Sequence, residues 1–297
     1  MANAAVEVLL HGLVDYAGLF PPAALPMAEA VRAYDEHRRG AHAWMLGRFV
    51  VPVTRLDEFA LHAAPLPGRG EPWRLSVLGG AADRETIERF NAQFGDRAVI
   101  DALEGKAATV EEVEGHAPLA SLRTPQGDPV SVFVEVPIAR DAGALVAAIA
   151  VGGLRAKVRT GGVTADAFPA AVELARFLGS CATSGVAFKA TAGLHHALRG
   201  DYRTTYEPES PRATMFGFLN VFLAACFLRA GLSEDRVVAV LEERDPEAFE
   251  FEPGGVVWGA HRLDADAIDA LRARFAVSFG SCSFAEPVQD LISMELL

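Results

Sequence analysis

The sequence predicts an α/β protein: a closed (β/α)8 TIM barrel forming one domain, residues 1–297, with a mostly helical insertion between strands seven and eight. Short apolar segments alternate with helical ones, and most strands start about 24 to 33 residues after the previous one, the length of one βα unit. A hydrophobic content of 51% in 297 residues supports one large core. No G-x-G-x-x-G follows the first strand, which disfavours an open doubly wound sheet, the main alternative.

Eight segments have the apolar, β-rich composition of strands buried on both faces. In chain order they are Leu13–Ala17, Trp44–Val51, Arg74–Leu78, Ala98–Leu103, Ser131–Val136, Arg155–Thr160, Val186–Thr191 and Phe275–Gly280. Helix signals lie between them. The clearest is Thr109 with Glu112, which has the spacing of a capping box.

The interval before the last strand is much longer and contains the insertion, residues 192–274. It should contain a polar loop, an apolar helix, a second helix, a hairpin and a third helix, at Arg199–Arg212, Thr214–Ala230, Ser233–Arg244, Phe249–Trp258 and Asp264–Arg274. A helix that is apolar on every side must be buried. We expect the apolar helix to pack inside the domain or against another subunit.

Composition excludes several classes of protein. A net charge of −12 argues against a nucleic-acid partner, because such binding needs a basic surface. The longest apolar run, Met215–Leu228, is shorter than the roughly 20 residues that cross a bilayer, so no membrane partner is expected. Three widely spaced cysteines and the absence of a signal-peptide pattern in Met1–Leu10 indicate a cytoplasmic protein.

Charged side chains inside strands are the informative ones in a barrel. Strand alternation places Lys157 and Arg159 on one face, and Glu135 and Lys189 likewise point inward on the neighbouring strands. Asp15 and Asp101 can join them. The sequence shows more cations than carboxylates here, so the cations should lower one another's pKa and make a lysine nucleophilic. The alternative is a buried ion-pair network with a purely structural role.

Glycine-rich segments follow three of these strands. They contain Thr160-Gly161-Gly162, Ala192-Gly193-Leu194-His195-His196 and Gly280-Ser281-Cys282-Ser283. Backbone N–H groups and hydroxyls at such strand ends can hold a phosphate or carboxylate. The segments therefore favour a small anionic metabolite as ligand.

These motifs resemble those of the Schiff-base (class I) aldolases of barrel type, most closely the deoxyribose-phosphate aldolase family. Lys157, Thr160 and Gly161 fit its K-x-x-T-G segment. Lys189 and Gly193 fit its K-A-[S/T]-G-G segment, with Ala192 in place of one glycine. The matches extend to both aspartates and to the last glycine-serine segment, at Asp15, Asp101 and Gly280-Ser281-Cys282-Ser283. Arg159, Ala17, the double histidine and the long insertion depart from the family pattern.

The resemblance implies a carbon–carbon lyase that needs no cofactor and no metal. It implies that Lys157 is the Schiff-base nucleophile, with Lys189 tuning its pKa and Asp101 as general acid/base. Glu135 is a further catalytic candidate from its inward position. We expect the substrate to be held by Asp15, Arg159, Thr160, Gly161, Gly193, His195, His196, Gly280, Ser281 and Ser283.

Two other functions stay open at this point. His195 and His196 with Glu135 or Asp101 can form the metal site of a hydrolase or isomerase. The second open function is a non-catalytic barrel that binds a metabolite or serves in an assembly. Full pairing of Lys157 and Lys189 with carboxylates would favour it. Cys282 with His195 as its base is a further candidate nucleophile. A homo-oligomer is expected from the apolar helix.

Overall fold

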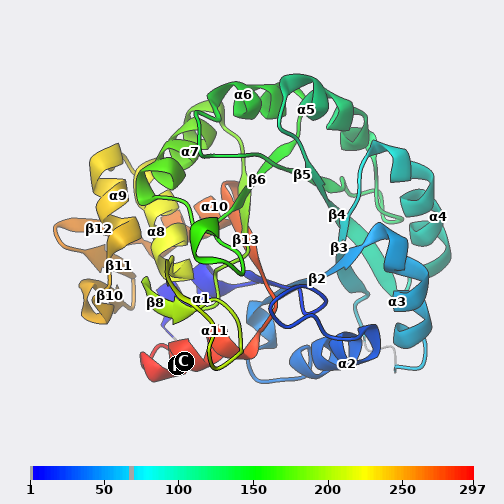
Figure 1. Ribbon diagram of the computed structural model, residues 1–297, viewed down its shortest axis with the longest axis horizontal. Coiled ribbons are helices and arrows are strands. Elements are labelled where there is room, and N and C mark those ends of the chain that lie inside the picture. Colours follow the sequence, from blue (N-terminus) through cyan, green and yellow to red (C-terminus); the bar gives the residue numbers. More distant parts are fainter. Residues whose placement is uncertain (1–2, 67–69) are drawn as a thin grey trace.

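The computed structural model describes residues 3–66 and 70–297. Within these residues, eight parallel strands close into a barrel surrounded by helices, as the sequence predicts (Figure 1). In spatial order around the barrel the strands are β1 (Val14–Tyr16), β13 (Ala276–Ser281), β7 (Phe188–Thr191), β6 (Arg155–Arg159), β5 (Ser131–Glu135), β4 (Ala98–Lys106), β3 (Trp73–Leu78) and β2 (Leu46–Pro52). Strand β1 pairs with β13, and this pairing closes the sheet.

Helices cover the outer face of the barrel and bury the outward side chains of the strands. Those belonging to the βα units are α2 (Met27–His37), α3 (Leu56–Ala63), α4 (Arg84–Phe94), α5 (Val110–His116), α6 (Gly143–Val151) and α7 (Ala171–Ser184). Helix α1 (Ala4–Leu10) precedes the first strand and α11 (Ala285–Ser293) follows the last. The predicted capping box is present, since Thr109 and Glu112 bond to each other's backbone N–H groups at the start of α5. Helix α7 ends at Gly185, whose φ of 66° is the left-handed conformation that glycine adopts readily.

The insertion between β7 and β13 lies outside the barrel, beside α7 in Figure 1. It contains β8 (Gly200–Arg203), β9 (Arg212–Met215), α8 (Phe218–Arg229), α9 (Glu234–Glu242), β10 (Phe249–Glu252), β11 (Gly255–Trp258), β12 (His261–Asp264) and α10 (Ala265–Arg274). The polar loop carries the hairpin strands β8 and β9, which the sequence analysis did not predict. The apolar helix therefore starts at Phe218 rather than Thr214, because Thr214 pairs in β9.

Helix α8 is buried by its own chain. All ten residues from Phe218 to Phe227 are buried, including Asn220, whose side chain bonds to backbone groups of three neighbours. Phe218 stacks on Phe279 of β13, and Phe222 stacks on Phe188 of β7. Of the two locations expected for this helix, packing inside the domain is the one observed. None of the described helices is both long and apolar enough to cross a bilayer.

Candidate active site

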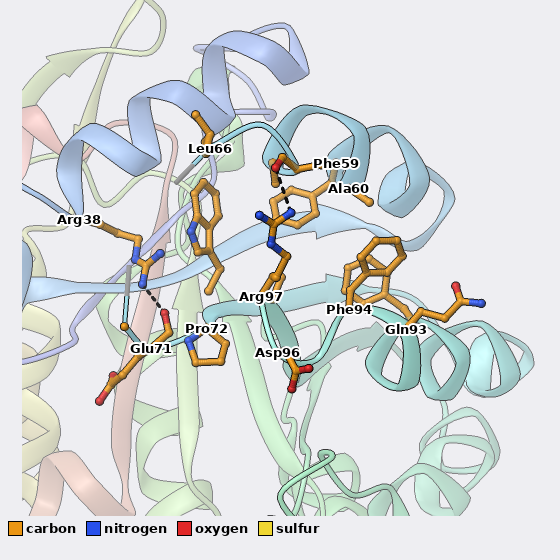
Figure 2. Close-up of a pocket in the computed structure, with 16 residues that line it drawn as sticks. Arg38, Phe59, Ala60, Leu66, Glu71, Pro72, Gln93, Phe94, Asp96 and Arg97 are labelled. Atoms are coloured by element: carbon orange, nitrogen blue, oxygen red, sulfur yellow. Dashed lines mark hydrogen bonds between the residues drawn. The ribbon is translucent and has the colours of Figure 1, made fainter. Parts of the chain in front are cut away.

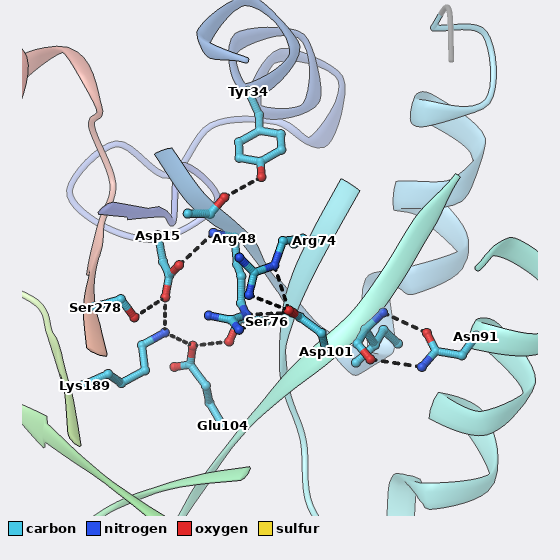
Figure 3. Close-up of polar contacts among 12 residues, drawn as sticks. Asp15, Tyr34, Arg48, Arg74, Ser76, Asn91, Asp101, Glu104, Lys189 and Ser278 are labelled. Atoms are coloured by element: carbon cyan, nitrogen blue, oxygen red, sulfur yellow. Dashed lines mark hydrogen bonds and ion pairs between the residues drawn. The ribbon is translucent and has the colours of Figure 1, made fainter. Parts of the chain in front are cut away.

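The interior of the barrel contains a chain of buried ion pairs. Lys189 on β7 donates to Asp15 Oδ2 on β1 at 2.7 Å and to Glu104 Oε1 on β4 at 2.6 Å (Figure 3). Lys157 Nζ on β6 lies 2.8 Å from Glu104 Oε2 and 2.9 Å from Glu135 Oε2 on β5. Two lysines and three carboxylates from five strands thus form one connected network.

Glu104 is the centre of this network, and the sequence analysis missed it. Both lysines bind its carboxylate, Ser76 donates to it at 2.6 Å, and its side chain is only 2% exposed. The analysis ended strand four at Leu103, whereas β4 continues to Lys106. In addition, the register between β3 and β4 skips Asp101, so simple alternation misassigns the residues beyond that point.

Asp101 lies elsewhere, and its assignment as an acid/base partner of Lys189 is corrected. Its carboxylate binds Arg48 Nε at 2.6 Å and Arg74 Nη2 at 2.7 Å, towards the amino-terminal ends of the strands (Figure 3). Asp15, predicted as a substrate contact, is bonded to other residues of the protein. It is completely buried, and it accepts bonds from Lys189, Ser278 and the backbone N–H of Arg48.

The electrostatics of Lys157 also differ from expectation. Burial lowers the pKa of Lys157, but the carboxylates of Glu104 and Glu135 outweigh it, and the net pKa is above the usual value. Burial raises the pKa of Glu104, but Lys157 and Lys189 outweigh it, and the net pKa is below the usual range. The predicted excess of cations is wrong because it omitted Glu104. In the resting protein Lys157 is an ammonium bound between two carboxylates.

A cavity of about 400 Å³ opens at the carboxyl-terminal ends of the strands; we call it the mouth. Lys157 and Glu104 lie at its base, and Lys189 is not among its lining residues. Phe20, Pro21 and Pro22 form part of its wall. The remaining predicted residues that line it are Arg159, Gly161, Gly193, His195 and Gly280. The mouth is therefore where a small molecule can reach Lys157.

Two cations at the mouth can face an anionic group. Arg159 Nε lies 3.2 Å from Glu135, and its side chain is 47% exposed. His195 Nδ1 lies 3.2 Å from Glu286 of α11 and 3.9 Å from Cys282 Sγ. Burial lowers the pKa of His195, but its bonds to Cys282 and Glu286 outweigh it and raise the pKa to about 9. His195 is therefore an imidazolium at neutral pH.

The glycine segments are close-packed rather than open. A Cβ added to Gly161 would clash with the ring of Phe168 and would lie 3.0 Å from Gly193 Cα. Thr160 is buried and donates to the carbonyl of Ala192 at 2.6 Å, so it joins two loops instead of contacting substrate. Ser281 and Ser283 are likewise absent from the lining of the mouth, and their hydroxyls accept bonds from the N–H groups of Ser283 and Glu286. The predicted contacts of these three residues with substrate stay predictions, and the structure gives each of them a hydrogen bond within the protein.

Both histidines line a cavity next to the mouth, but only His195 also lines the mouth. His196 stacks on Tyr202 and lies 3.1 Å from Asp290, and it lines a neighbouring cavity rather than the mouth. Among residues 3–66 and 70–297, no three His, Cys, Asp or Glu side chains are grouped as metal ligands. The geometry of the described residues therefore offers no support for the metal-dependent alternative.

Tyr206 completes the cluster at one side of the mouth. It comes from the connection between β8 and β9, and its hydroxyl donates to Glu286 at 3.1 Å and lies 3.5 Å from Cys282 Sγ. Tyr206 and Glu286 were not predicted as site residues. They come from the insertion and from the last helix, and no local sequence motif joins them to His195.

A second cavity, of about 250 Å³, lies on the outside of the barrel between α3 and α4 (Figure 2). Its lining includes the aromatic side chains of Phe59, Trp73, Phe90 and Phe94. It is lined by no lysine and by none of the buried ion pairs among the described residues. The mouth is therefore the candidate active site. Comparisons with protein-family models, curated proteins and solved structures found no match to this chain.

Proposed function

We propose that this chain is an enzyme of the Schiff-base aldolase kind, in which Lys157 forms an imine with the carbonyl of a small anionic metabolite. The observation that carries the proposal concerns lysine itself. The chain contains three lysines, Lys106, Lys157 and Lys189. Every other residue in its total of lysines and arginines is an arginine. All three lysines contact the same carboxylate network, Lys106 lying 3.8 Å from Glu135. Arginine supplies a structural positive charge, but only lysine supplies an amine that becomes nucleophilic.

The network assigns a role to each member. Lys157 attacks the carbonyl carbon, water leaves, and the resulting iminium accepts the electron pair of the carbon–carbon bond that breaks. Glu104 and Glu135 are the nearest bases for the proton that Lys157 must lose first. Lys189 holds Glu104 in place and keeps it ionised. Arg159 and the His195 imidazolium attract the anionic group of the substrate.

Borohydride trapping tests the proposal. The protein is reduced in the presence of pools of aldehydes and keto acids, and the modified peptide is identified by mass. We expect one adduct, on Lys157. Lys157→Arg should keep the ion pairs and the fold but abolish trapping, whereas Lys106→Met, at an exposed lysine, should leave it unchanged. Trapping that persists in Lys157→Arg would overturn the imine at Lys157.

A non-catalytic barrel that binds a metabolite is the second candidate, because both lysines are fully paired and Lys189 is only 1% exposed. In that case the mouth binds an anion through Arg159 and His195 without forming an imine. No trapping from pH 7 to pH 10, with saturable binding of a keto acid that Arg159→Gln removes, would favour this candidate over the enzyme.

A further inference from the structure

A cavity of about 590 Å³ lies at the opposite end of the barrel, around the amino-terminal ends of the strands; we call it the amino-end cavity. Five arginines line it, from five different elements or their flanking segments. They are Arg38, Arg48, Arg74, Arg155 and Arg272. The lining also contains two carboxylates, Glu71 and Asp269. This concentration of guanidinium groups is notable in a chain with a net charge of −12.

Only part of this positive charge is neutralised by the protein. Asp101 pairs with both Arg48 and Arg74 (Figure 3). The guanidinium of Arg272 donates to backbone carbonyls, to that of Leu9 at 2.7 Å and to that of His11 at 3.2 Å. Arg38 donates to the carbonyl of Glu71 at 2.8 Å. These carbonyl acceptors satisfy hydrogen bonds, but they carry no full negative charge.

Arg155 is the most informative of the five. It stands at the start of β6, two residues before Lys157, so it points into the barrel on the same face. Its guanidinium packs 5.7 Å from the ring centroid of Phe133 and forms no ion pair with any residue that the structure describes. Burial and the neighbouring Arg48 lower the pKa of Arg155, and together they outweigh the opposite effect of the Asp101 carboxylate. A half-buried guanidinium held beside another cation is a position that an anion would stabilise.

We propose that the amino-end cavity binds a dianionic phosphoryl group, free or as part of a phosphate ester, through Arg155, Arg48 and Arg74. Guanidinium groups donate paired N–H bonds that match phosphate oxygens, and three of them, from β2, β3 and β6 around one cavity, can surround one such group. Ser131, which also lines the cavity, adds a hydroxyl donor. A volume of about 590 Å³ leaves space for an organic portion beside the phosphoryl group.

Isothermal titration calorimetry with inorganic phosphate and with glycerol 3-phosphate tests this site. The titration uses Arg159→Gln protein, which removes the exposed arginine at the mouth and so weakens phosphate binding there, leaving His195 as the one cation of that pair. Arg155 and Arg159 are a matched pair, because they lie on the same strand and the same face at opposite ends of the barrel. We expect one phosphoryl group per chain in Arg159→Gln, bound at least about tenfold more weakly once Arg155→Gln is added. Tighter binding of the ester than of phosphate identifies an ester as the source.

A second variant guards against loss of binding through misfolding. Asp101→Asn releases Arg48 and Arg74 from their carboxylate, so it should strengthen phosphate binding about tenfold, a gain that an unfolded protein cannot produce. The proposal is overturned if Arg159→Gln shows no saturable binding below about 10 mM phosphate. It is equally overturned if the added Arg155→Gln leaves the affinity unchanged.

Discussion

The two ends of the barrel treat buried charge in opposite ways. In the network that reaches the base of the mouth, the inward cations Lys157 and Lys189 are each bound by two carboxylates, so the charges are balanced and fixed in position. At the amino end, Arg48 and Arg74 share one carboxylate and Arg155 has none among the described residues. A balanced network can hold a reactive amine in place, whereas an unbalanced one attracts an anion from solution. The difference separates a candidate chemical site from a candidate binding site within one barrel.

The strongest test of this contrast removes the centre of the balanced network. Glu104→Gln leaves two buried ammonium groups with one carboxylate each, and we expect the free energy of unfolding to fall by about 3–5 kcal/mol. Urea denaturation measures it. Glu58→Gln, which breaks an exposed pair with Arg55, is the matched control and should leave the midpoint unchanged. A Glu104→Gln protein as stable as the parent would show that the network carries no net stabilisation.

The same network sets the acid limit of stability. The pKa of Glu104 and Glu135 is lowered in the folded protein, so their contribution is complete above the ordinary value of 4.5 and is lost as pH falls towards the lowered values. Glu104→Gln should therefore flatten the loss of stability below pH 4.5. Lys157 acts in the other direction, since its raised pKa makes its contribution fall only as pH rises above 10.5.

A smaller effect concerns the reactivity of Lys157 at the mouth. With its pKa raised, the fraction of neutral amine near pH 7 is small and increases about tenfold for each unit of pH. Borohydride trapping should increase in the same way. Glu135→Gln removes one of the two carboxylates, so the trapping profile should shift about one unit towards lower pH, about a tenfold gain at pH 7. An unshifted profile would mean that Glu135 does not control the amine.

The smallest effect on the reactivity of Lys157 is expected from a substitution near the amino-terminal ends of the strands. Asp101→Asn should leave trapping at Lys157 within about twofold of the parent, because Asp101 contacts Arg48 and Arg74 and neither lysine. The free energy of unfolding should fall by about 1–3 kcal/mol, since two arginines lose their partner. Trapping rate and denaturation midpoint are measured on the same protein. A tenfold loss of trapping would return Asp101 to the acid/base role that the sequence motif implies.

The spacing of the strands was enough to predict the barrel, because short apolar runs recur along the chain at about the length of one βα unit. Strand alternation also predicted that Glu135, Lys157 and Lys189 point inward together. It could not locate Glu104 or exclude Asp101, because one irregular residue in β4 changes which side chains face the interior. Tyr206 and Glu286 contact Cys282 and His195 beside the mouth only through the tertiary position of the insertion and of α11. Contacts between segments so far apart in the chain leave no periodic pattern in the sequence from which they can be predicted.

Closure of the barrel by its first and last strands bears on how the chain folds as the ribosome makes it. Strand β1 pairs with β13, and Asp15 meets Lys189 only across that strand. At about 5–20 residues per second, residues 192–275 take on the order of 4 to 17 s to be synthesised after β7 has been made. During that time β1 and β7 are open sheet edges, and Phe218 and Phe222 of α8 lack the cover of Phe279. The nascent chain thus exposes a helix that is almost wholly buried in the native fold, together with two unpaired strand edges, and such surfaces favour aggregation until the last strand emerges.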